Sequence, residues 1–423
     1  MSAVISVAAA DTFQEALMPP RTAEPHAPGV MSTLSIVIPA YNEEKAIGAI
    51  VERCLAARDY IKDGTNIADV EIIVVNDGSA DRTKDVAAGY RDITLISHPV
   101  NRGYGVAIKT GFAAARGDLV AFLDADGTCD PRFFRDLARA LEQGRADISI
   151  GSRLTPESRM PFTRLVGNVF YALLLGALSN RTVTDTASGM RILRRSSLSR
   201  IFPLPDGMDF TPAMSAKALF DEELVIVETP MPYHERVGAS KLKVISDGIR
   251  FFRSIVECAL IYRPGRLFSL LALPFLLVAV LFSVHPIEVY VRERQLEEWM
   301  IYRLITVLMC YLAASVLLTA SVVSERFVTV IRGRRRSPGF AFGLAQRFVT
   351  PRLLAGTAAV LLIVTTLLNW EAARQYLTTG QIAEHWSRVL VGGFLVSAAV
   401  HLLVTSVLVR MTDILLAKQA DRH

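Results

Sequence analysis

The chain has 423 residues, of which 51% are hydrophobic, and a formal net charge of +5 at pH 7. This length exceeds one ordinary domain and predicts at least two units, each with its own core. The hydrophobic residues concentrate after residue 265, which argues against a wholly soluble protein. This distribution indicates a soluble N-terminal part followed by a membrane-embedded C-terminal part. Arg residues cluster beside the apolar spans, so we interpret most of them as contacts to anionic lipids and as determinants of membrane topology. Some are expected to bind phosphate groups of a ligand, and no nucleic-acid partner is expected.

The 4 cysteines lie far apart and form no CxxC or Cys/His metal pattern. Neither a disulfide framework nor a zinc site is therefore expected, as suits a reducing compartment. The N-terminal residues 1–32 are rich in Ala and Pro, and Asp11 interrupts their only apolar run, unlike a secretory signal. We predict a disordered tail there, with Met31 as an alternative start.

From Leu34 onward, apolar β-branched runs alternate with segments of helical periodicity. Strands are predicted at residues 34–40, 70–79, 93–99, 118–126 and 146–153, and helices at residues 41–57, 81–90, 105–116 and 131–144. Because the strand runs lack polar alternation, they indicate an α/β fold with a mostly parallel sheet and helices on both faces. Asn42 is the expected N-cap of the first helix, with Glu43 and Glu44 in its first turn.

Chemically active residues follow the carboxyl ends of the predicted strands, where parallel sheets bind their ligands. They are Pro39, Asp77, Asp124, Asp126 and Arg153. Asp124 and Asp126 are two positions apart on a strand, so both side chains point the same way and would converge. A divalent cation, Mg²⁺ or Mn²⁺ bridging a diphosphate, would offset their mutual repulsion. A structure in which both acids faced away from any crevice, or were locked to Lys or Arg, would contradict this interpretation.

Between Leu242 and Tyr262, apolar residues occupy one helical face and charged residues lie elsewhere. A basic amphipathic helix just before a membrane span is typical of an interfacial helix in the lipid headgroup layer. An ordinary surface helix of the soluble domain is the alternative interpretation.

Four long apolar segments follow, each near the roughly 20 residues needed to span a bilayer. They lie at residues 267–284, 301–323, 353–370 and 389–411. By the positive-inside rule, the Arg-rich loop after the second segment, the N-terminal domain and the C-terminal tail are all expected on the cytoplasmic side of a cell or inner membrane. The predicted organisation is a tail (1–32), a catalytic domain (33–240), a juxtamembrane helix (241–264) and a transmembrane domain of four helices (265–423).

Short motifs are spaced along the front half of the chain. They are IPAYNE, VVNDGSADRT, NRGYGVAIKTG, FLDADGTCDP, GSR, DTASGMR and ERVGASKLK, within residues 34–265. In this order they resemble family 2 glycosyltransferases of the GT-A fold, most of all the polyprenyl-phosphate sugar synthases of the dolichol-phosphate mannose synthase type. The resemblance implies a Rossmann-like GT-A domain with Mg²⁺ or Mn²⁺ as cofactor. It also implies transfer of a hexose from GDP-mannose or a UDP-sugar such as UDP-glucose to undecaprenyl or dolichyl phosphate.

The resemblance assigns roles to individual residues. The nucleotide sugar would contact Pro39, Tyr41, Glu43, Asp77, Ala125 and Arg153. The metal would bind Asp124 and Asp126, with Thr128 standing where mannose-synthase-like members often place a Gln ligand. The acceptor phosphate would contact Arg164, Ser188, Arg191, Arg236 and Lys241, with Asp185 on the same side. The residues implied in catalysis are Asp124, Asp126, Arg153 and Arg236.

A lipid phosphate is mostly an oxyanion at neutral pH, because its second pKa lies near 6. It needs a cationic cradle rather than a strong general base, and single in-line displacement at the anomeric carbon predicts inversion. Two other functions stay open: a processive membrane polysaccharide synthase, although its QxxRW motif is not in the sequence, and a non-catalytic membrane scaffold with a degenerate transferase domain. The sugar, its nucleotide, the metal preference and any homo-oligomer are left undetermined.

Overall fold

The computed structural model describes residues 31–155, 158, 160–236, 238, 241–293, 296–332 and 349–420. The predicted tail, almost to its end, and most of the Arg-rich loop lie outside the described residues. The chain divides into two compact units, Met1–Ala259 and Leu260–His423, which are described separately. The domain boundaries predicted from the sequence stay predictions.

The first unit is built on a seven-stranded sheet with the strand order β3-β2-β1-β4-β6-β5-β7. The strands are β1 (Ser32–Ala40), β2 (Ile67–Asn76), β3 (Thr94–Ser97), β4 (Leu119–Leu123), β5 (Ile148–Ser152), β6 (Met190–Arg194) and β7 (Ile226–Pro230). Strand β6 runs antiparallel between β4 and β5, whereas all other neighbouring strands pair in parallel. The sequence predicts the five parallel strands β1 to β5 but neither β6 nor β7.

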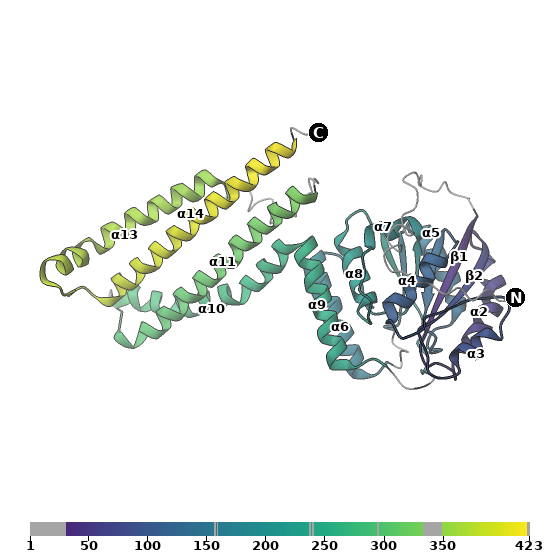
Figure 1. The fold of residues 1–423 in the computed structure, drawn as a ribbon. Coiled ribbons are helices and arrows are strands. Elements are labelled where there is room, and N and C mark those ends of the chain that lie inside the picture. Colours follow the sequence, from purple (N-terminus) through teal and green to yellow (C-terminus); the bar gives the residue numbers. More distant parts are fainter. Residues whose placement is uncertain are drawn as a thin grey trace. The chain divides into compact units, whose positions relative to one another are not determined.

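Helices cover both faces of this sheet (Figure 1). On one face, α2 (Ile47–Lys62) and α5 (Phe134–Gln143) join β1, β2 and β4 in one buried apolar cluster. On the other face lie α4 (Tyr104–Ala114) and α8 (Phe210–Phe220), where the rings of Phe112, Phe122 and Phe210 make a chain of contacts across β4. The predicted α/β fold is confirmed. Shorter elements are α3 (Thr83–Ala88), α7 (Leu198–Ile201) and the 3₁₀ turns Pro131–Phe133 and Arg195–Ser197.

The loop between β1 and α2 differs from the prediction. Asn42 does not cap the helix, because α2 begins only at Ile47 after Ala46. Instead Asn42 has a φ of 49°, and its side-chain oxygen accepts the Ala80 N–H at 2.8 Å. Asn42 and Glu43 in turn donate their backbone N–H groups to the hydroxyls of Ser79 and Thr83. This loop is therefore tied to the loop after β2, at the edge of the sheet where the strands end.

Two helices of the first unit, α6 (Phe162–Ser179) and α9 (Val244–Tyr262), lie side by side (Figure 1). The Tyr171 hydroxyl of α6 donates to the Gly248 carbonyl of α9 at 2.7 Å, and Phe170 stacks on Phe252 with ring centroids 6.5 Å apart. Large apolar side chains of both helices stay exposed, among them Phe162 (76%) and Ile245 (80%). The sequence predicts the amphipathic helix α9 but not its partner α6.

The second unit consists of long apolar helices. They are α10 (Pro264–Glu293), α11 (Ile301–Arg332), α13 (Pro351–Thr379) and α14 (Trp386–Ala420), with the 3₁₀ turn Glu298–Met300 before α11. Helix α10 packs on α11, α11 on α14 and α14 on α13. Each predicted span lies within one of these helices, and all four are long and apolar enough to cross a membrane. Helix α6 also meets these criteria of length and composition, giving five such helices among the described residues, but it belongs to the first unit.

Candidate active site

A cavity of about 350 Å³ opens at the carboxyl ends of the parallel strands of the first unit. It brings together Pro39, Tyr41, Glu43, Asp77, Asp124, Ala125, Asp126, Thr128, Arg153, Arg164, Arg236 and Lys241. These residues come from the loops after β1, β2, β4 and β5, from α6, and from the segment between β7 and α9. Parallel strands that end at one edge of a sheet explain why residues so far apart in sequence converge here.

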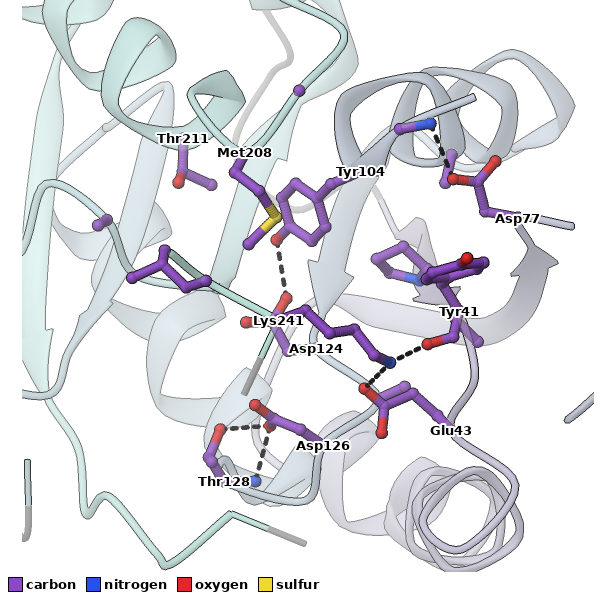
Figure 2. Close-up of a pocket in the computed structure, with 18 of the residues that line it drawn as sticks. Tyr41, Glu43, Asp77, Tyr104, Asp124, Asp126, Thr128, Met208, Thr211 and Lys241 are labelled. Carbon is purple, nitrogen blue, oxygen red and sulfur yellow. Dashed lines mark hydrogen bonds and ion pairs between the residues drawn. The ribbon is translucent and has the colours of Figure 1, made fainter. Parts of the chain in front are cut away.

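The two acids of the DAD sequence both face the cavity (Figure 2). Asp124 Oδ1 accepts the Tyr104 hydroxyl at 2.7 Å. Asp126 Oδ1 accepts the backbone N–H and the hydroxyl of Thr128, at 3.1 and 2.6 Å. Its other oxygen, Oδ2, accepts Arg236 Nη1 at 2.9 Å. The structure thus gives Thr128 a contact that holds Asp126, while its direct contact with a metal stays a prediction.

Two cations from the segment before α9 partly neutralise the acids. Arg236 bridges Asp126 and Glu43, with Nη2 2.7 Å from Glu43 Oε1. Lys241 Nζ lies 2.7 Å from the same Glu43 oxygen and also donates to the Tyr41 carbonyl (Figure 2). Because a protein cation contacts Asp126 whereas a neutral hydroxyl contacts Asp124, the acids are not both locked to Lys or Arg. One of the two acids is thus paired with an Arg, and the metal assignment stays a prediction.

The charge at Asp124 is undercompensated. Burial raises the pKa of Asp124 to about 7, and repulsion from Asp126 acts in the same direction, against the opposing Tyr104 hydrogen bond and the charges of Arg153 and Arg236. Such a site suits a divalent cation, which favours ionised carboxylates. Among the described residues, no group of three or more His, Cys, Asp or Glu side chains could hold a metal ion. A pair of carboxylates fits Mg²⁺ or Mn²⁺ when substrate phosphates supply the remaining oxygens.

This pKa predicts a stability effect that can be measured without substrate. An ionised Asp124 is unfavourable in the folded state, so the wild type loses stability as pH rises from about 4 to its folded pKa of about 7. In EDTA at pH 8 we expect Asp124→Asn to unfold at a higher temperature than the wild type, by about 1–3 kcal/mol in stability. The difference should shrink toward pH 5. A thermal-unfolding series over pH checks this, and an equal difference at every pH would contradict it.

Asp77 is the anchor of the loop before α4. Its Oδ1 accepts the Arg102 N–H at 2.9 Å and contacts His98 Nδ1 at 2.7 Å, and its Oδ2 accepts the Gly103 N–H at 2.9 Å. Gly103 has a φ of 106°, a conformation that favours glycine and lets the chain turn into α4. Since Oδ2 accepts one hydrogen bond here, it can still accept a second from a nucleobase.

Arg153 is fixed by a buried ion pair with Asp185. Its Nε and Nη2 donate to the two Asp185 oxygens at 2.7 and 2.8 Å, and its backbone N–H donates to Oδ2 at 2.9 Å. Asp185 is fully buried and also accepts Asn168 Nδ2 at 2.9 Å. Burial alone would raise the pKa of Asp185, but the Arg153 charge and these hydrogen bonds outweigh it and hold that pKa below its ordinary value. Arg153 thus presents to the cavity a guanidinium of fixed orientation, 5.7 Å from the Tyr233 ring centroid.

Ser188 and Arg191 do not lie where the resemblance implies. Both are fully buried, and neither belongs to the described residues that line the cavity. The Ser188 hydroxyl donates to the Gly151 carbonyl at 2.6 Å, and Arg191 Nη2 donates to the Thr186 carbonyl at 2.7 Å. These two hydrogen bonds stabilise the segment around Asp185 from the buried side. The implied contact of Ser188 and Arg191 with an acceptor phosphate is therefore wrong. Ser188 lies just before β6 and Arg191 lies on it, and both support the fold around the cavity.

Several lining residues escape the sequence analysis. They are Asn101, Tyr104, Met208, Thr211, Tyr233, Arg250 and Phe251. The sequence does contain an indication for Tyr104, because this residue lies in the NRGYG motif directly before a predicted helix. No sequence signal indicated Met208 and Thr211, because they lie just before and in the first turn of α8, a helix that the sequence does not predict.

The first unit is thus an α/β domain whose cavity, at the carboxyl ends of the strands, is lined by two neighbouring acids and several cations. Residues 35–202 match the glycosyl transferase family 2. The chain is 33% identical over 231 residues to the dolichyl-phosphate hexose transferase of Haloferax volcanii, covering 54% of this chain and 94% of that protein. The chain belongs to glycosyl transferase family 2, and relatives of it are named as sugar transferases or synthases of polyprenyl phosphates.

Two further similarities each cover somewhat more than half of the chain. The low-salt glycan biosynthesis hexosyltransferase Agl6 of Haloferax volcanii is 34% identical over 247 residues, which span 57% of this chain but only 56% of that relative. Among solved structures, glucosyl-3-phosphoglycerate synthase of Mycobacterium tuberculosis, with Mn²⁺ and UDP-glucose, is 21% identical and has a TM-score of 0.44. That match covers 54% of this chain and 79% of the other.

Proposed function

We propose that this protein transfers a hexose, with inversion, from a nucleotide-diphosphate sugar to a polyprenyl phosphate. The observation that carries the proposal is the composition of one cavity: Asp124 and Asp126 lie together on its floor, and several cations line it. These cations are Arg153, Arg164, Arg236 and Lys241. Paired acids suit a metal-bound diphosphate, and a cationic cradle suits a second anionic substrate. The relative named dolichyl-phosphate hexose transferase supports a hexose as the group transferred and a polyprenyl phosphate as the acceptor.

On the donor side, the nucleoside would lie against Pro39, Tyr41 and Asp77, at the ends of β1 and β2. A divalent cation held by Asp124 and Asp126 would supply positive charge to the leaving diphosphate. Arg153 would contact the same diphosphate. Its guanidinium is already oriented by Asp185, so little conformational entropy would be lost when the diphosphate binds.

On the acceptor side, Arg236 and Lys241 would change partners. In the structure both contact Glu43. A polyprenyl phosphate entering the cavity would compete with this carboxylate for them and be held for attack on the anomeric carbon. Since the phosphate oxygen is already ionised at neutral pH, the cavity needs no residue to deprotonate it.

Lys241→Gln is expected to weaken acceptor binding. It removes one cation from the cradle while keeping a side chain of similar length, so the KM for polyprenyl phosphate should rise about tenfold with a smaller change in the KM for donor. Lys243→Gln is the matched control, because Lys243 is exposed two positions away and does not line the cavity among the described residues. Steady-state kinetics with both substrates varied gives the KM for each substrate in the two variants and the wild type. Equal effects of the two substitutions would contradict the assignment.

The exposed apolar faces of α6 and α9 support a place at a membrane surface. Arg164 of α6 and Arg250 of α9 line the cavity while apolar side chains of the same two helices stay exposed. We propose that these faces lie in the lipid headgroup layer and bring the cavity to the acceptor. The protein would be multi-pass, with its catalytic unit and both termini in the cytoplasm.

The direct test is a donor panel with the purified full-length protein. Radiolabelled UDP-glucose, other UDP-sugars and GDP-mannose are each incubated with undecaprenyl or dolichyl phosphate and Mg²⁺ or Mn²⁺. Label extracted with the lipid as a single sugar supports the proposal, and free polyprenol serves as the control acceptor. Polymeric product would favour a polysaccharide synthase, and no transfer from any donor would favour a scaffold.

A further inference from the structure

The hydroxyl of Tyr104 fixes the orientation of Asp124 (Figure 2). It donates to Asp124 Oδ1 at 2.7 Å. Asp124 Oδ2 lies against Gly189, where a Cβ would overlap it, so the carboxylate is confined from both sides. We propose that Tyr104 is a positioning residue for the reaction: it holds Asp124 so that the remaining lone pairs face the cavity and its divalent cation. The inference rests on the proposed function, in which Asp124 and Asp126 bind that cation.

Tyr104 is itself held rigidly from several elements. It is the first residue of α4, and Asp77 accepts the backbone N–H groups of the two residues before it. The N–H of Gly105 donates to the Asp206 carbonyl at 2.8 Å. The Tyr104 ring meets Phe210 of α8 edge-on, with centroids 6.5 Å apart. A hydroxyl on such a frame can impose an orientation on its partner rather than follow it.

The two acids differ in what orients them. Asp126 is held by Thr128 through two hydrogen bonds and by Arg236 through an ion pair. For Asp124, the Tyr104 hydroxyl is the hydrogen-bond donor within the described part of the chain. A tyrosine hydroxyl is a neutral donor at physiological pH, because its ordinary pKa lies near 10. A neutral donor orients a carboxylate without competing with a cation for its charge.

Tyr104→Phe tests the role, since it removes the hydroxyl and keeps the ring on Phe210. Binding of Mn²⁺ to the purified full-length protein is followed by electron paramagnetic resonance, with UDP or GDP, whichever supports transfer, present at saturation. Loss of an orienting partner typically weakens metal affinity about 10–100-fold, and we expect a loss in that range. Tyr90→Phe is the matched control: its hydroxyl bonds Glu52 at 2.9 Å, outside the lining of the cavity, and Mn²⁺ affinity should not change.

A double variant separates positioning from general stability. If Tyr104 acts through Asp124, adding Tyr104→Phe to Asp124→Asn should leave the residual Mn²⁺ affinity unchanged, whereas independent effects would add. Wild-type affinity in Tyr104→Phe, or full additivity in the double variant, overturns the inference and leaves the metal site intact. Failure of the wild type to retain Mn²⁺ overturns the proposed metal site, and the inference with it.

Discussion

Asp124→Asn and Asp126→Asn are each expected to reduce transfer at least about a hundredfold, a loss of about 2.7 kcal/mol in transition-state stabilisation. Both acids face the cavity, and each substitution removes a negative charge with little change in shape. The diphosphate would then lose the cation that neutralises it as the sugar departs. Transfer to polyprenyl phosphate at saturating donor, measured with purified variants, gives the result directly.

Asp118→Asn is the control on the same strand. Asp118 is exposed at the amino end of β4, whereas Asp124 follows the carboxyl end of that strand, so this substitution makes the same chemical change away from the cavity. It should retain full activity. Expression and membrane insertion should be normal in all three variants. Full activity in purified Asp124→Asn or Asp126→Asn would remove the metal assignment.

Asp185→Ala is expected to cost about 3–5 kcal/mol of folding stability, because it leaves the Arg153 guanidinium without its buried partner. A loss of this size lowers the unfolding temperature of a domain of this class by roughly 10 °C. Transfer should also fail, since the Arg153 side chain loses the two hydrogen bonds to Asp185 that orient it toward the cavity. Thermal unfolding in detergent, followed by far-UV circular dichroism, measures the loss of stability.

A paired substitution separates structure from catalysis at this site. Replacing both partners, Arg153→Met with Asp185→Leu, removes the buried charges together and should recover much of the stability lost in Asp185→Ala. Transfer should stay low, because the cation facing the diphosphate is gone. Recovery of transfer along with stability would show that Arg153 serves the fold alone, and would exclude it from the donor site.

Much of the first unit could be predicted because its pattern is local. Continuous apolar runs such as that of β4 mark strands buried on both faces, and the acids after them must then lie at one edge. Two features were out of reach of such reasoning. Strand β6 enters the sheet antiparallel between β4 and β5, a choice set by long-range pairing rather than by its own five residues. Helix α6 has the hydropathy of a membrane span, yet its Asn168 is buried against Asp185.

The site shows the same division between local and long-range information. The sequence predicts Asp77, Asp124 and Asp126 at the site because they lie at the carboxyl ends of predicted strands; in the structure β4 ends at Leu123, so Asp124 and Asp126 lie in the turn after it rather than on the strand. The resemblance alone implies contact of Ser188 and Arg191 with the acceptor, whereas in the structure both side chains bond backbone carbonyls inside the protein. A motif locates a segment, but the direction of each side chain within it depends on how the segment is packed.

The cluster of Glu43, Asp126, Arg236 and Lys241 has a consequence for selectivity. Two acids and two cations in mutual contact balance one another, so a charged ligand that enters this part of the cavity has to replace internal ion pairs. A ligand that brings charges of both signs, as a metal–diphosphate does, can replace the internal pairs without leaving any group uncompensated. If the donor binds here as proposed, the cluster would therefore favour the complete metal–diphosphate over either of its parts.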